Sequence, residues 1–206
     1  MLSIVKIYIL RYNFNRRGGT QMKSIFILLT RSNTCISKAI KLATNDTYTH
    51  VSISFHANLQ PLYSFARKYS VTPLPAGLRT ESFTTGFYKK NNGIPCALYE
   101  LKVEDSIYNA AKDAVETMMK NSCVYRYNIM GLILCRLNIP FHREHHYFCS
   151  EFVSAILKEH HAIELPKEPS LMRPNDYTNM PLLSCLFEGT LNNLEPYHNA
   201  YRMALL

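Results

Sequence analysis

The hydrophobic and polar positions along the chain predict short strands and a few helices. Apolar or alternating stretches of strand length lie at residues 24–29, 49–55, 62–66 and 95–103. Apolar residues at helical spacing predict helices over residues 36–43, 106–119 and 149–159, the second of them capped by Ser106. The order is strand, helix, strands, helix, helix, which is typical of an α+β fold.

Two stretches show no such period. Residues 68–93 hold two prolines and three glycines, and they are predicted to form a long loop or excursion. The tail beyond residue 165 is interrupted by prolines at 166, 169, 174 and 181 and contains no repeat and no low-complexity run.

Length and composition favour one folded domain. The chain has 206 residues, of which 47% are hydrophobic and 18% charged. Such a chain can bury a substantial core, and it is too apolar for a disordered tail. No run approaches the ~20 apolar residues of a membrane-spanning helix. We expect a single domain over residues 22–206.

Residues 1–21 differ from the rest in charge. They carry four basic side chains and no acidic one, which is half of the net charge of +8. Codons for Gly18-Gly19 can spell a bacterial ribosome-binding sequence a short spacer ahead of the ATG of Met22. This segment is therefore either a basic arm or an extension from an upstream start codon. The remaining basic residues form no dense stripe, so we expect no nucleic-acid partner.

The cysteines point to a reducing compartment. The chain has six cysteines, and no two of them have CxxC spacing. An even number would suit disulfides in a secreted protein. However, no export signal with a small-residue cleavage site is recognisable. We therefore expect a cytoplasmic protein with free thiols.

Cys149 opens the helix predicted over residues 149–159. The first turn of a helix has unpaired N–H groups and a positive dipole end, which favour a thiolate and can lower the pKa of a thiol. The same groups can stabilise a developing oxyanion. The alternative is a cysteine that packs as a small apolar residue in the core.

His50 lies on the polar face of the strand predicted over residues 49–55, opposite Val51, Ile53 and Phe55. A histidine in this position is either a surface residue or a group that looks into a cleft. A helix-opening cysteine and a strand histidine are the two parts of a thiol hydrolase. There the histidine takes the thiol proton and later protonates the leaving group.

These segments resemble a known family. Thr49–Phe55 (THVSISF) followed far downstream by Tyr147–Val153 (YFCSEFV) resembles the circularly permuted papain-fold amidases, the permuted branch of the NlpC-like cysteine hydrolases. In ordinary papain-like enzymes the cysteine precedes the histidine, whereas here the histidine comes first. Leu62–Arg67 after the histidine, Tyr127-Asn128-x-x-Gly131 before the cysteine and Arg173–Asp176 after it also resemble this branch.

The resemblance implies an antiparallel sheet packed against the helix that carries Cys149. It also implies hydrolysis of an amide, peptide or acyl-thioester bond by a Cys149–His50 dyad, without a cofactor, on a peptide-like or acylated small substrate. The family includes peptidoglycan-type hydrolases and lipid-acyl transferases. A thiol acyltransferase on the same residues and a non-catalytic binding module therefore remain alternatives.

The third catalytic position departs from the family. Many members place an acidic or amide residue on the strand after the histidine, where it orients the imidazole. The matching segment here is Tyr63-Ser64-Phe65, so Ser64 is the predicted orienting residue. A serine is a weak orienter beside a carboxylate, which also stabilises imidazolium. Glu151 points away from Cys149 on its own helix, so we expect it to have a structural role.

A metal site is the rival interpretation of this region. His142, His145, His146 and Cys149 are good zinc ligands, but their spacing fits no zinc module that we recognise. We therefore expect a solvated histidine-rich loop and no metal. Tyr147 is a candidate substrate contact, because aromatic residues near Cys149 could line a groove for a peptide or acyl chain. Core packing is the alternative.

Overall fold

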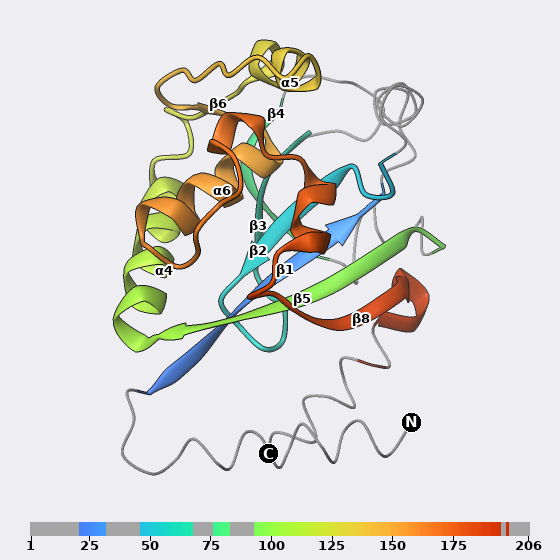
Figure 1. Cartoon of the computed structure of the whole chain (residues 1–206). Coiled ribbons are helices and arrows are strands. Elements are labelled where there is room, and N and C mark those ends of the chain that lie inside the picture. Colours follow the sequence, from blue (N-terminus) through green and yellow to red (C-terminus); the bar gives the residue numbers. More distant parts are fainter. Residues whose placement is uncertain (1–20, 32–45, 68–75, 83–92, 195–196, 198–206) are drawn as a thin grey trace.

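The computed structural model describes residues 21–31, 46–67, 76–82, 93–194 and 197. At its centre is a six-stranded antiparallel sheet in the order β4-β3-β2-β1-β5-β8 (Figure 1). Its strands are β1 (Met22–Thr30), β2 (His50–Ser54), β3 (Leu62–Arg67), β4 (Ala76–Glu81), β5 (Pro95–Glu104) and β8 (Ser184–Thr190). With the helices that pack on this sheet, the architecture confirms the α+β class.

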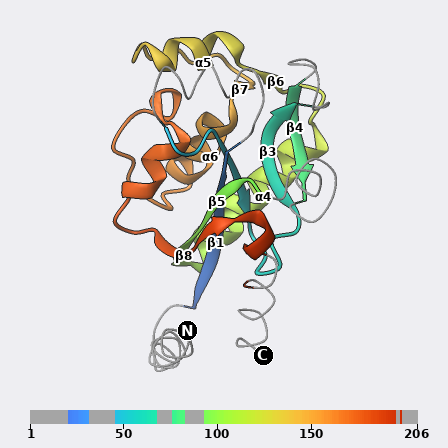
Figure 2. The same ribbon diagram turned by 90° about the vertical axis from the view of Figure 1, so that its right-hand side faces the viewer.

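Two helices cover one face of the sheet. These are α4 (Asp105–Lys120), which contacts β1 and β5, and α6 (Cys149–Glu159), which contacts β2 and β3. A short helix, α5 (Ile129–Arg136), lies beyond the start of α6 at the end of the molecule (Figures 1 and 2). Beside it, β6 (Arg126–Tyr127) pairs in parallel with β7 (His146–Tyr147). Two 3₁₀ turns follow α6: η1 (Pro169–Leu171) and η2 (Pro174–Asn179).

Strand β1 organises the core. It pairs with β5 along its whole length and with β2 along its second half. Its odd-numbered apolar residues, such as Ile27, join the large core under α4 and α6, whereas Phe26 and Leu28 join a smaller core on the opposite face. Burial on both faces explains why this strand is a continuous apolar run rather than an alternating one.

Most of the predicted elements are confirmed. β1, β2, β3 and β5 occupy the four predicted stretches, and α4 and α6 occupy two of the predicted helices. Helix α4 begins at Asp105 with Glu104 as its N-cap, so the prediction of Ser106 as the cap is wrong. The helix predicted over residues 36–43 and nearly all of the segment 1–21 lie outside the described residues.

The sequence patterns missed two strands of the sheet. β4 lies inside the stretch predicted to be a long loop or excursion, which corrects that prediction, and β8 lies in the proline-rich tail, for which no element was predicted. Both strands are at the edges of the sheet, where strands are short and gain less from a hydrophobic pattern. β4 has a single buried residue, Leu78, so its sequence gave little periodic signal. This strand nevertheless brings an acidic residue to the site described next.

Candidate active site

Helix α6 holds the cysteine at its first residue. Cys149 follows the N-cap Phe148, is 5% exposed and belongs to the large core. The Glu151 carboxylate reaches back to accept a hydrogen bond from the Phe148 N–H at 3.3 Å, which fixes the start of the helix. Cys149 therefore lies where the unpaired N–H groups of the first turn are concentrated.

His50 is the first residue of β2, and its ring is held by a carboxylate. Its Nε2 atom lies 2.8 Å from Oε2 of Glu81, the last residue of β4. The same carboxylate oxygen accepts a hydrogen bond from the Ser52 hydroxyl at 2.8 Å. The His50 and Glu81 side chains are each only 14% exposed, so water screens their interaction weakly.

The Cys149 thiol interacts with this histidine. Burial by itself would raise the pKa of Cys149. However, a hydrogen bond with His50, the charge of His50 and backbone hydrogen bonds from Val51 and Ser150 outweigh burial and lower that pKa. The arrangement favours a thiolate paired with an imidazolium.

The charges of the histidine and the carboxylate support each other. Burial alone would lower the pKa of His50, but the charge of Glu81 and the hydrogen bonds with Cys149 and Glu81 raise it to about 10. Burial would likewise raise the pKa of Glu81, but the charge and hydrogen bond of His50 and the Ser52 hydroxyl lower it. Cys149, His50 and Glu81 thus form one connected chain of groups.

Ser64 occupies a different place from the one predicted for it. Its hydroxyl donates to the Val51 carbonyl at 2.8 Å, and it is fully buried. The registered pairing of β2 with β3 is limited to Ile53 and Tyr63, so this side-chain bond ties the two strands together beyond the ladder. The carboxylate of Glu81, rather than the hydroxyl of Ser64, is the partner of the His50 ring.

Sequence analysis missed Glu81 because of where it lies. It comes 31 residues after His50 in the chain, on an edge strand, and β3 lies between β4 and β2. In the family that the chain resembles, the orienting residue lies on the strand directly after the histidine, which here is β3 and not β4. A signal was present in the hairpin formed by β3 and β4, since an acidic residue ends its second strand.

The other predicted residues divide between packing and structure. The Tyr147 ring contacts those of Phe65 and Phe152, and burial raises its pKa to about 12. A role for Tyr147 in substrate binding stays a prediction. Glu151 has the structural role expected of it: besides the Phe148 N–H, it accepts a hydrogen bond from the Asn128 amide at 3.1 Å.

The four residues of the rival metal site point in different directions. His142 contacts Glu151, His146 contacts the Glu144 carbonyl, and Cys149 interacts with His50. The His145 ring packs against Tyr125 instead. Among the described residues, no group of three or more histidine, cysteine or acidic side chains is placed to hold a metal ion.

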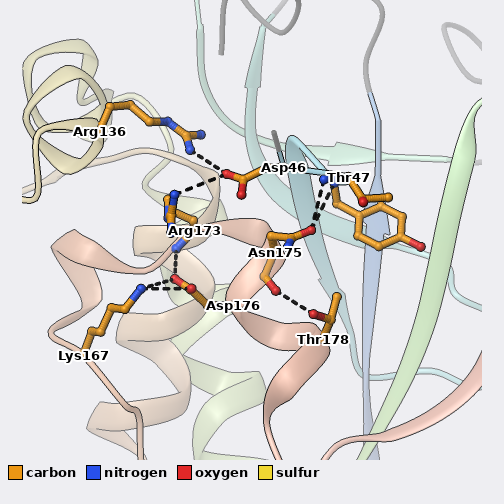
Figure 3. A network of polar contacts seen from close by, with 9 residues as sticks. Asp46, Thr47, Arg136, Lys167, Arg173, Asn175, Asp176 and Thr178 are labelled. Atoms are coloured by element: carbon orange, nitrogen blue, oxygen red, sulfur yellow. Dashed lines mark hydrogen bonds and ion pairs between the residues drawn. The ribbon is translucent and has the colours of Figure 1, made fainter. Parts of the chain in front are cut away.

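A polar network holds the segment that leads into β2. Asn175 Oδ1 accepts hydrogen bonds from the backbone N–H groups of Thr47 and Tyr48, at 3.2 and 3.5 Å (Figure 3). Asp46 lies 3.0 Å from Arg136 and 3.6 Å from Arg173. Because His50 follows these anchored residues directly, the network limits the movement of its backbone.

A second set of contacts in this network orders the turn that carries Asn175. The Asp176 carboxylate accepts a hydrogen bond from the Arg173 N–H at 2.8 Å and forms an ion pair with Lys167 at 2.9 Å (Figure 3). The Thr178 hydroxyl donates to the Asn175 carbonyl at 2.8 Å. The motif Arg173–Asp176 therefore supports the position of His50 from a distance.

Comparisons with known proteins leave the site to be interpreted from its own geometry. No protein-family model matches the chain, and no curated protein matches it. Within the described ranges, none of the helices has the length and apolar character needed to cross a membrane.

Proposed function

We propose that this protein is a cysteine-dependent hydrolase of the permuted papain-like, NlpC-like type, acting on an amide, peptide or acyl-thioester bond. Cys149 is the nucleophile, His50 is the general acid and base, and Glu81 orients His50. The observation that carries the proposal is the chain of contacts from Glu81 Oε2, 2.8 Å from His50 Nε2, through the ring to the Cys149 thiol.

The proposed reaction begins with attack by the thiolate. Cys149 Sγ forms a bond to the carbonyl carbon of the substrate, and the carbonyl oxygen gains the negative charge. N–H groups at the start of α6 are placed to stabilise that charge. The proton on His50 then moves to the leaving amine or thiol as its bond to carbon breaks. The product of this step is a thioester between the acyl group and Cys149.

Water completes the cycle. Neutral His50 takes a proton from a water molecule, whose oxygen attacks the thioester carbon. The carbon–sulfur bond breaks, the acid leaves, and Cys149 and His50 return to the thiolate–imidazolium pair. Throughout, Glu81 fixes the ring orientation and stabilises its charged form, which is the part that a carboxylate plays in a catalytic triad. Ser52 holds Glu81 in place through its hydroxyl.

Glu81 also bears on the two alternatives. The argument for a non-catalytic module was the weakness of Ser64 as an orienting residue. A buried carboxylate on the His50 ring removes that argument. An acyltransferase would form the same thioester and differ only in the acceptor, so added alcohols or amines distinguish transfer from hydrolysis.

Trapping the acyl-enzyme tests the proposal. The protein is mixed with p-nitrophenyl acetate, and the site of acetylation is mapped by mass spectrometry over time. We expect one rapid acetyl group on Cys149 in the wild-type protein and none there in Cys149→Ser. Cys185→Ser is the matched control, because Cys185 is an exposed cysteine away from the site. Equal acetylation of Cys123, Cys149 and Cys185 would contradict the proposal.

A further inference from the structure

Helix α5 exposes apolar side chains to solvent. Ile129, Met130, Ile133 and Leu137, the last of them its C-cap residue, are 42%, 53%, 52% and 64% exposed. At 100° per residue these positions fall within one arc of about 100°, so they form a continuous stripe. We call these four residues the α5 apolar face. Val124 and Ile139, on either side of the helix, are exposed as well.

This orientation is the reverse of that of an ordinary surface helix. The side of α5 that faces the protein carries Gly131 and Cys135, which are its only fully buried residues. Asn128 caps the helix by accepting a hydrogen bond from the Gly131 N–H at 2.8 Å. Arg136 holds the other end through Asp46. Because both ends are anchored, the helix cannot rotate to bury its apolar face.

The surroundings of the α5 apolar face are basic. Residues 122–144 contain three arginines, Arg126, Arg136 and Arg143, and one acidic residue, the exposed Glu144. Arg126 on β6 pairs with His146, which also forms a bridge with Arg143, so these two exposed arginines lie close together beside α5. An apolar stripe bordered by cations is the pattern of a surface that binds anionic lipid.

We propose that the α5 apolar face docks on an anionic membrane surface, with its apolar side chains among the acyl chains and Arg126 and Arg143 among the headgroups. A second copy of the chain is the less favourable occupant, since a two-fold contact at this face would bring Arg126 and Arg143 of both copies together with Glu144, which is 87% exposed, as the one acidic neighbour next to them in sequence. The eight residues of α5 suit an interfacial helix and not a spanning one. This proposal does not depend on the proposed function.

Vesicle flotation tests the docking proposal. The full chain is mixed at physiological salt with vesicles of phosphatidylcholine alone or of phosphatidylcholine with phosphatidylglycerol. We expect it to float with the anionic vesicles. Ile133→Ser should weaken binding about tenfold, which corresponds to the loss of one inserted aliphatic side chain. Arg126→Gln and Arg143→Gln should each weaken it about fivefold.

Two controls distinguish binding through the α5 apolar face from nonspecific hydrophobic binding and from effects on the active site. Leu182→Ser removes an apolar side chain that is 63% exposed, close to the 64% of Leu137, but lies elsewhere, so it should leave vesicle binding unchanged. Alkylation of Cys149 should stay the same in all these variants, which keeps the test independent of the site. The proposal fails if the wild-type chain does not bind anionic vesicles, or if Leu182→Ser weakens binding as much as Ile133→Ser. A dimer in solution that Ile133→Ser dissociates, without vesicle binding, would assign the face to a second copy instead.

Discussion

Two pairs of a histidine and a glutamate lie near the start of α6, and they differ in kind. In the first, His50 lies 2.8 Å from Glu81, and both side chains are 14% exposed. In the second, His142 lies 3.3 Å from Glu151, but the histidine is 61% exposed while the glutamate is buried. Only in the first pair does the histidine also interact with the Cys149 thiol.

The electrostatics of the two carboxylates go in opposite directions. The charge of His50 lowers the pKa of Glu81 in spite of its burial. For Glu151, burial raises the pKa, and the hydrogen bonds from Asn128, His142 and the Phe148 N–H only oppose that rise. In the His50–Glu81 pair both side chains are buried and the charges support each other, which suits catalysis. In the His142–Glu151 pair only the glutamate is buried, and it holds the start of α6.

The largest contrast is expected from removing each histidine. His50→Ala should slow alkylation of Cys149 by iodoacetamide at neutral pH by about 10²-fold or more, because the thiolate loses its cationic partner. His142→Ala is the matched control and should leave the rate unchanged. Mass-spectrometric mapping of the alkylated cysteine measures both. Equal alkylation rates in the two variants would show that His50 and His142 do not differ in their effect on Cys149, which would contradict the account.

Glu81→Gln should narrow the pH range in which Cys149 and His50 exist as a thiolate–imidazolium pair. The charge of Glu81 is the largest influence that raises the pKa of His50 to about 10, so its loss lowers the pH at which the imidazolium disappears. Since the folded pKa lies above the ordinary 6.5, the stabilisation from the His50 charge is complete below pH 6.5 and is lost as pH rises through about 10.

The pH profile of the acylation of Cys149, the step in which His50 gives its proton to the leaving group, measures this effect. We call the pH above which the rate falls, because His50 has lost its proton, the alkaline limit. In the wild-type protein it should lie near pH 10, and in Glu81→Gln it should move toward neutral pH. Glu151→Gln is the matched control at the second pair and should leave the alkaline limit where it is. An unchanged limit in a folded Glu81→Gln protein would remove Glu81 from the site.

Glu151→Ala should act on stability instead. It leaves the Phe148 N–H and the Asn128 amide without their acceptor inside the protein, which costs about 1–3 kcal/mol for a buried group. Denaturant unfolding should show a lower midpoint with the same slope. The rate of Cys149 alkylation in the folded protein should change little. A large loss of reactivity at full stability would show that this pair also takes part in the chemistry.

Ser52→Ala should have the smallest effect. The hydroxyl is a neutral donor to Glu81, and such a bond contributes about 1 kcal/mol. We expect the alkaline limit to move slightly in the direction seen for Glu81→Gln. Ser64→Ala is a useful comparison, since its hydroxyl bonds to the Val51 carbonyl and should leave the limit unchanged. A larger shift in Ser64→Ala than in Ser52→Ala would reverse the assignment of the two serines.

Sequence patterns predicted what is local and missed what is distant. The helix that begins at Cys149 and the strand that begins at His50 were predictable, because a helical stripe and an alternating strand are encoded in neighbouring residues. Glu81 was not, because an edge strand with one buried residue has almost no period. The outward apolar face of α5 was also missed, because an apolar helix facing solvent has the same sequence pattern as one facing the core.

The state of Cys149 in the resting protein tests the central claim most directly. Thiolate absorbs in the ultraviolet and thiol does not, so the difference in absorbance between the wild-type protein and Cys149→Ser follows this one group as pH changes. We predict that the thiolate signal of Cys149 appears below the ordinary thiol pKa of 9.0, because the hydrogen bond and charge of His50 lower the pKa of this thiol. A signal that appears only as pH rises through 9.0 would show an ordinary thiol, and it would contradict the ion pair on which the proposed hydrolase rests.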